Sequence, residues 1–178
     1  MKKILLVLLV VFTASSVFAA GIGIKGGYSK MYDDYADGYG GEGFDDTWNF
    51  GIVFDMGTFL FNNLQFRPGI DYLSLENEDA NYEYADVYGI HIDWYWFFMG
   101  KKQFSPFLGF GPALNYYSFS DDQTNNDDSD AGIEGFAGVD FDLSGPWKLM
   151  VELRYLWHDI ADRDTTIVKL NIGLLYYF

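Results

Sequence analysis

The 178-residue sequence contains no cysteine, four prolines and two histidines, and it has few basic residues. The absence of cysteine excludes disulfides and thiol chemistry. With 11 lysines and arginines against 26 aspartates and glutamates, the formal net charge is −15. This excess of acidic residues argues against binding nucleic acid and against direct adhesion to anionic lipid. After its first segment the sequence also lacks any apolar run long enough to predict a membrane-spanning helix.

The first 19 residues have the pattern of a secretory signal peptide. Two lysines precede an unbroken apolar run, Ile4–Phe12, which is shorter than the roughly 20 residues that a membrane helix needs. Val17–Phe18–Ala19 then fits a small-residue cleavage site. We therefore expect a Sec-type signal peptide over residues 1–19 and one mature domain over residues 20–178.

The sequence is rich in aromatic residues (20%) and glycine, and it alternates apolar with other residues. The pattern is clearest in Thr165–Phe178, where every second residue back from the end is apolar and the other phase carries Lys169 and Asn171. Because side chains alternate faces along a strand, this predicts a strand with one apolar face. Eight such strands are predicted, at about 21–29, 48–56, 64–75, 86–98, 104–119, 132–144, 147–158 and 165–178.

Short connections alternate with long acidic ones between these segments. Of the 26 acidic residues, 19 lie in or beside the four long connections, 30–47, 76–84, 120–131 and 159–164. Short turns at one end and long loops at the other are typical of an antiparallel up-and-down transmembrane barrel. An even number of strands predicts that both ends of the mature chain lie on the short-turn side.

The remaining strand charges all fall in the phase opposite the apolar face. A soluble barrel of this sequence would expose about six large apolar residues per strand, far more than a tolerable apolar patch. The apolar face is therefore predicted to meet lipid and the charged face to line the lumen. Eight strands enclose a space that side chains can fill, so the charges must pair in a packed lumen. The predicted lumen ion-pair network comprises Lys25, Asp55, Arg67, Asp71, His91, Asp93, Glu134, Asp140, Asp142, Lys148, Glu152, Arg154 and Lys169.

Two further features bear on local structure and on metals. Pro68 and Pro112 fall within predicted strands, where each removes a ladder donor, so we expect local bulges there. The segment Asp121–Asp130 alternates oxygen-bearing side chains, but it lacks the sixth-position glycine and closing glutamate of a calcium loop. A solvated acidic loop is favoured, and no metal site or cofactor is predicted.

The signal peptide, the eight alternating strands, the four long connections and the terminal Phe178 resemble the small OmpA/OmpX-type outer-membrane β-barrel family. The resemblance implies an all-β, eight-stranded barrel in the outer membrane of a Gram-negative cell envelope, in contact with outer-membrane lipid and lipopolysaccharide. It also implies that Leu174, Tyr176 and Phe178 form the signal read by the barrel-assembly machinery, after periplasmic chaperones have handled the unfolded chain.

The predicted function is a structural or surface-interaction role, with long acidic extracellular loops and no enzymatic activity. Two alternatives stay open. A narrow, porin-like channel for ions or small solutes would use the lumen charges. A lipid-A-modifying enzyme or protease would use His158 at the loop end of its strand, with Asp159, Asp162 and Asp164 close by in sequence. No serine stands in a nucleophile motif, which favours the non-enzymatic role.

Overall fold

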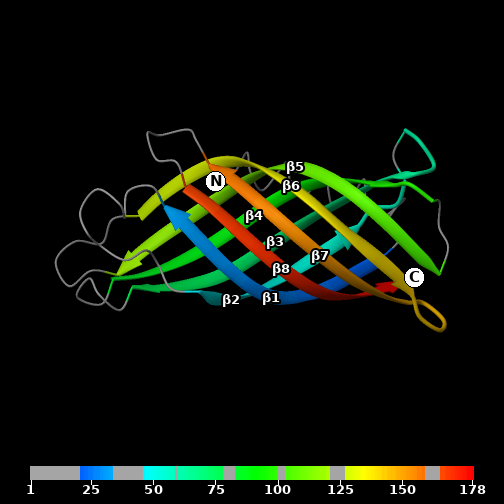
Figure 1. Ribbon diagram of the computed structural model, residues 1–178, viewed down its shortest axis with the longest axis horizontal. Coiled ribbons are helices and arrows are strands. Elements are labelled where there is room, and N and C mark those ends of the chain that lie inside the picture. Colours follow the sequence, from blue (N-terminus) through cyan, green and yellow to red (C-terminus); the bar gives the residue numbers. More distant parts are fainter. Residues whose placement is uncertain are drawn as a thin grey trace.

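The computed structural model describes residues 21–33, 46–58, 60–77, 83–99, 103–120, 127–158 and 165–178; the predicted signal peptide lies outside these ranges. Within them the chain forms a closed antiparallel barrel, in which each strand pairs with the next and the last pairs with the first (Figure 1). No helix in these ranges is long and apolar enough to cross a membrane. The predicted fold class is confirmed. The strands are β1 (Gly21–Asp33), β2 (Thr47–Asp55), β3 (Leu64–Asn77), β4 (Glu83–Phe97), β5 (Phe104–Ser120), β6 (Asp127–Asp142), β7 (Trp147–His158) and β8 (Thr165–Tyr177).

The short connections β2–β3, β4–β5 and β6–β7 lie at the same end of the barrel as the C-terminus (Figure 1). We call this the turn end, and the opposite end, where the long connections begin, the loop end. In the first short connection Met56 donates to the Phe66 carbonyl (2.9 Å), and Phe66 donates to the Gly57 carbonyl (3.1 Å). Met56 and Gly57 together therefore lie opposite the single residue Phe66. Gly57 has a positive φ of 83°, a backbone conformation that favours glycine.

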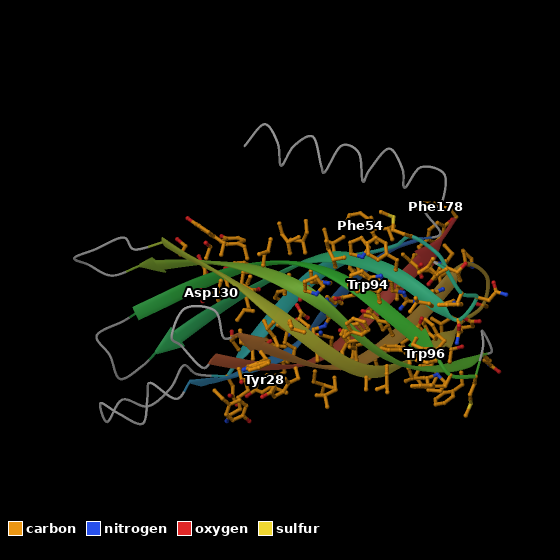
Figure 2. All side chains as sticks on the ribbon, turned by 90° about the horizontal axis from the view of Figure 1, so that it is seen from above. Tyr28, Phe54, Trp94, Trp96, Asp130 and Phe178 are labelled. Carbon is orange, nitrogen blue, oxygen red and sulfur yellow. The ribbon has the colours of Figure 1, made fainter. Side chains whose placement is uncertain are left out.

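Alternation along each strand separates the two faces of the barrel (Figure 2). On β4, Tyr95 is 0% exposed, whereas the adjacent Trp96 is 56% exposed. The interior holds the charged phase of the sequence, and the outer surface carries the large apolar side chains. Aromatic side chains gather toward both ends of this outer surface, among them Tyr28 and Trp48 at the loop end and Trp147 and Phe178 at the turn end.

Several strands are longer than the apolar pattern predicts. β6 begins at Asp127, five residues before the predicted start, and pairs with β5 through Asn115–Asp130 and Tyr117–Asp128. Residues 127–130 of the segment considered as an acidic loop therefore belong to a strand. Backbone pairing continues beyond the apolar residues because the ladder is formed by peptide groups, which do not require apolar side chains.

The bulges predicted at Pro68 and Pro112 are wrong. Pro68 pairs with Ile92, and Pro112 with Ile133, in an unbroken register. On the side of Pro112 that faces β4, two residue pairs are missing from the β4–β5 ladder. On the side of Pro68 that faces β2, the β2–β3 ladder ends at Gly69, the next residue. Proline lacks an N–H toward one neighbouring strand only, so one ladder loses a bond while the register of both is kept.

A mainly apolar cluster fills the turn-side part of the interior. The sequence predicted a polar lumen and did not indicate this cluster. Its rings pack edge-on or tilted, with centroids 4.5 Å apart for Tyr95–Phe136 and 4.9 Å apart for Tyr95–Phe107. Glycines make room for these rings: a Cβ added at Gly109 would lie 2.0 Å from Cε2 of Phe136. The cluster consists of Val53, Tyr95, Phe97, Phe107, Phe136, Met150 and Leu175.

Replacing Gly109 with alanine should destabilise the barrel. The new methyl group would overlap the Phe136 ring, and overpacking of this kind costs about 1–3 kcal/mol. Gly135→Ala is the matched control, because nothing lies within 4 Å of a Cβ at Gly135. Urea unfolding midpoints of the two variants in vesicles measure the difference. Equal midpoints would show that Phe136 has free space beside it.

Candidate functional site

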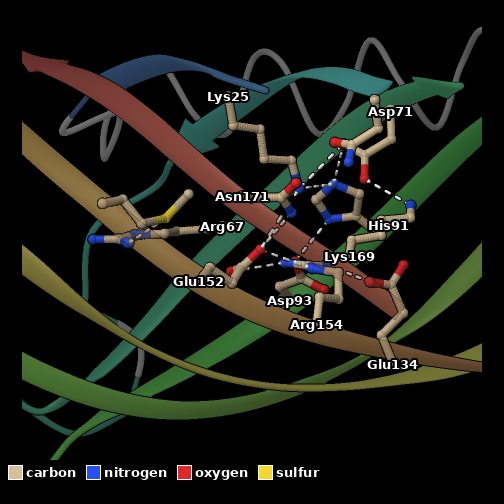
Figure 3. A network of polar contacts seen from close by, with 12 residues as sticks. Lys25, Arg67, Asp71, His91, Asp93, Glu134, Glu152, Arg154, Lys169 and Asn171 are labelled. Carbon is tan, nitrogen blue, oxygen red and sulfur yellow. Dashed lines mark hydrogen bonds and ion pairs between the residues drawn. The ribbon is translucent and has the colours of Figure 1, made fainter. Parts of the chain in front are cut away.

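The guanidinium of Arg154 on β7 lies at the centre of the interior (Figure 3). Its Nη2 atom lies 2.7 Å from Asp93 Oδ2, its Nε atom lies 2.9 Å from Glu152 Oε1, and its Nη1 atom pairs with Glu134. These carboxylates come from β4, β7 and β6, and all four side chains are at most 1% exposed. A planar guanidinium with five N–H donors suits this arrangement, since it can serve three carboxylates at once.

Asp93 also connects Arg154 to a second group of charges. His91 Nδ1 lies 2.7 Å from Asp93 Oδ2, and His91 Nε2 lies 3.3 Å from Lys25 Nζ. Asp71 lies between two lysines, with Lys25 Nζ 3.1 Å from its Oδ1 and Lys169 Nζ 3.1 Å from its Oδ2. These contacts form one connected network, which we call the central network, and it joins strands β1, β3, β4, β6, β7 and β8.

Arg67 on β3 forms a separate cluster nearer the turn end. Its Nε lies 3.0 Å from Asp55 Oδ2, and its Nη2 lies 2.5 Å from Asp140 Oδ2 and 2.8 Å from Gln65 Oε1. The hydroxyl of Tyr177 on β8 donates to Asp55 Oδ2 at 2.5 Å. Arg67 is 0% exposed, and charge-assisted hydrogen bonds of this type are the strong class in proteins.

Tyr95 joins the two arginine clusters. Its ring centroid lies 4.7 Å from Cζ of Arg67, a cation–π distance. Its hydroxyl donates to Glu152 Oε2 at 2.7 Å and accepts from Arg154 Nη2 at 3.0 Å. Because the ring serves one cluster and the hydroxyl the other, Tyr95 couples them.

Two of the predicted network residues lie apart from the others. Lys148 Nζ contacts Asp142 Oδ1 at 3.1 Å, but these side chains are 15% and 38% exposed, at the turn end of β6 and β7. They form a pair at the rim because Asp142 ends β6 and Lys148 is the second residue of β7, opposite it in the ladder. Sequence reasoning also left Gln65, Tyr95 and Tyr177 out of the network, although all three occupy the lumen phase and carry hydrogen-bonding groups.

The predicted assembly residues lie on the outer surface at the turn end. The Tyr176 ring packs against Trp147 with centroids 4.9 Å apart and against Phe178 at 5.6 Å. Phe178 is 82% exposed, and Leu174 is 36% exposed on the same face of β8.

The interior geometry does not suit catalysis. His91 and Asp93 are 1% and 0% exposed and already contact each other, Lys25 and Arg154, so a substrate has no access to them. The side chain of His158 and the carboxylates that follow it lie outside the described residues. The rim-enzyme hypothesis therefore stays a prediction.

Metal coordination is not indicated within the described ranges. They contain no group of three or more histidine, aspartate or glutamate side chains that could hold a metal ion. Of the acidic segment weighed as a calcium loop, residues 121–126 lie outside the described part of the chain, and Asp128 and Asp130 belong to β6.

Removing the guanidinium with Arg154→Met should leave three buried carboxylates without their cation. Breaking a buried ion pair in this way costs about 3–5 kcal/mol, which urea unfolding of the folded barrel would measure. Lys148→Met, in the partly exposed pair at the rim, is the control and should change the free energy of unfolding by about 1 kcal/mol at most. A similar small loss for both variants would contradict the central position of Arg154.

Known proteins share this architecture. A family model described as the outer membrane protein beta-barrel domain matches residues 4–178. No curated protein matches the chain in sequence.

Solved structures of outer-membrane proteins share the fold at low sequence identity. Neisserial surface protein A (NspA) is 17% identical, with a TM-score of 0.70 over 89% of this chain and 96% of that one. Ail, the attachment invasion locus protein of Yersinia pestis, is 16% identical, with a TM-score of 0.55 over 90% and 99% of the two chains. OprG from Pseudomonas aeruginosa is 16% identical, with a TM-score of 0.53 over 90% and 96%.

Proposed function

The chain belongs to the outer membrane protein beta-barrel domain family, and on this basis we propose a structural and surface-interaction role in the bacterial outer membrane. The observation that carries the proposal is the packed, ion-paired interior. The side chains of Lys25, Arg67, Arg154 and Lys169 are each at most 2% exposed, and each contacts at least one carboxylate. Such an interior supports the wall of the barrel and leaves recognition to the surface outside the membrane.

A narrow channel is less well supported than this role. A solute crossing the barrel would have to pass both arginine clusters and separate several charge-assisted hydrogen bonds in each. Enzymatic activity is likewise not proposed, because the histidine and carboxylates of the interior are buried and already paired.

Reconstituted in planar bilayers, the purified barrel should show no conductance at the level of porins. The expected result follows from the interior side chains, which fill the space that eight strands enclose. Arg67→Ala with Arg154→Ala in one chain is the comparison, since it removes the guanidinium from each of the two arginine clusters. Steady porin-level currents from the unaltered protein would refute the packed-interior role.

The charge of the long connections indicates the kind of surface partner. They contain or adjoin 19 acidic residues, against the two cations Lys30 and Arg163. Ail has been solved in complex with the heparin analogue sucrose octasulfate, a polyanion. A polyanion would be repelled by the acidic connections of this chain, so we propose a cationic partner, attracted by charge complementarity.

Vesicles carrying the barrel should bind an oligolysine peptide in low salt and release it as ionic strength rises, because exposed charges are screened. Heparin should not bind. A variant with asparagine and glutamine in place of the eleven acids in residues 34–45, 78–82, 121–126 and 159–164 should insert normally and lose much of the peptide binding. Undiminished binding by that variant would place recognition elsewhere on the protein.

We also propose that Leu174, Tyr176 and Phe178 present the outward face that the assembly machinery reads. Deleting Phe178 should slow insertion into the membrane while leaving the unfolding midpoint of the assembled barrel nearly unchanged, because this ring is largely exposed. Pulse-chase assembly in cells, with Leu60→Ala at an exposed turn position as the control, measures the rate. An unchanged insertion rate would count against the signal.

A further inference from the structure

A groove of about 710 Å³ crosses the outer face of β8, β1, β2 and β3 and reaches β7 at one end. It lies between two rows of outward side chains that the strand register places next to each other. The turn-side row consists of Leu149, Leu174, Ile24, Ile52 and Ile70, and the loop-side row of Ile172, Gly26, Phe50 and Tyr72.

The groove passes Gly26, which supplies no side chain to the loop-side row, and the Phe50 ring lies beside it, with Cδ1 3.4 Å from where a Cβ at Gly26 would be. Its neighbours Ile24 and Phe50 are 66% and 62% exposed and project beyond it. Two residues along a strand span about 7 Å, which sets the spacing of the two rows. Lys25 and Asp71 also border the groove, but their side chains are buried on the lumen side, so they contribute backbone to its floor.

We propose that this groove binds an acyl chain of a phospholipid from the periplasmic leaflet. The groove continues the lipid-facing surface of the barrel, and no charged side chain projects into it. Its turn-side end, at Leu149 and Leu174, lies next to the aromatic residues Trp147 and Tyr176, where periplasmic headgroups meet the protein. The chain would extend from there toward the middle of the membrane.

The negative charge at the loop-side end disfavours lipopolysaccharide as the source of the acyl chain. At the loop-side end Tyr72 donates to Asp86 Oδ1 at 2.9 Å, so a carboxylate borders this end. An anionic headgroup in the outer leaflet would meet like charge there. At the turn-side end the outward side chains beside the groove, Trp147 and Tyr176, carry no charge.

A second copy of the chain fits the groove poorly. A two-fold contact centred on Gly26 would place one concavity against another, and packing in a closed interface requires the opposite, a ridge against a groove. A flexible hydrocarbon chain can follow a narrow groove instead.

The groove is also held in shape from behind. On the lumen side Lys25 Nζ of β1 contacts Asp71 Oδ1 of β3 at 3.1 Å, and Gly51 of β2 lies between them. This ion pair fixes the two strands that carry the groove walls. A preformed site of this kind binds without the cost of ordering its walls.

Photo-crosslinking tests the proposal with phosphatidylethanolamine that carries a diazirine in one acyl chain. The probe is added in small amount to phosphatidylethanolamine and phosphatidylglycerol vesicles that contain the barrel, and labelled residues are mapped by mass spectrometry. Labels should concentrate on the groove residues Ile24, Phe50 and Ile172. Gly26→Leu should strongly reduce this labelling, because the added side chain would occupy the space between Ile172 and Phe50 where the acyl chain would lie.

Two further variants make the result specific. Gly135→Leu fills a second outward glycine position in the described strands, which borders β5 and β7, and should leave groove labelling unchanged. Phe50→Ala removes one wall of the groove without adding a larger side chain, and it should also reduce labelling of the groove residues. This variant still tests the proposal if Gly26→Leu fails to fold. Even labelling around the barrel, labelling that survives both groove variants, or crosslinks between two barrels through this face would each overturn the proposal.

Discussion

Backbone groups that face hydrocarbon have no water to bond, so the pairing of β1 with β8 governs the rest of this structure. The two strands pair over thirteen positions, from Gly21–Tyr177 to Asp33–Thr165. This seam joins the first and last strands, which removes both sheet edges. Once the sheet is closed by eight strands, the diameter is fixed, and the interior can hold side chains but little else.

The closed interior then determines which charges the sequence can tolerate. Six carboxylates and four cations are buried in the described interior, and each cation contacts a carboxylate. An isolated buried charge would be very costly, whereas a guanidinium shared by three carboxylates satisfies the partners together. The central network thus follows from closure, because only a narrow barrel brings β4, β6 and β7 within reach of one side chain.

The sequence predicted the faces of the strands well, because a period of two specifies inside and outside directly. It could not predict partners. Arg154 lies 61 positions from Asp93 and 20 from Glu134, and their meeting depends on the stagger of strands around the barrel, which alternation does not contain. The start of β6 at Asp127 was also missed, because the backbone ladder begins several residues before the first apolar residue of the strand. Proline effects were misjudged because a lost N–H affects only one neighbour.

The ties across the lumen have a mechanical consequence. Arg67 connects β3 to β6, and Arg154 connects β7 to β4, so compression that flattened the cross-section would stretch short ion pairs. Toward the loop end the interior instead contains Ala113, Leu156 and Ile167, whose apolar contacts are not directional. The barrel should therefore be stiff over its turn-side part and more compliant toward the loop end, where a force applied to the long connections would change its outline.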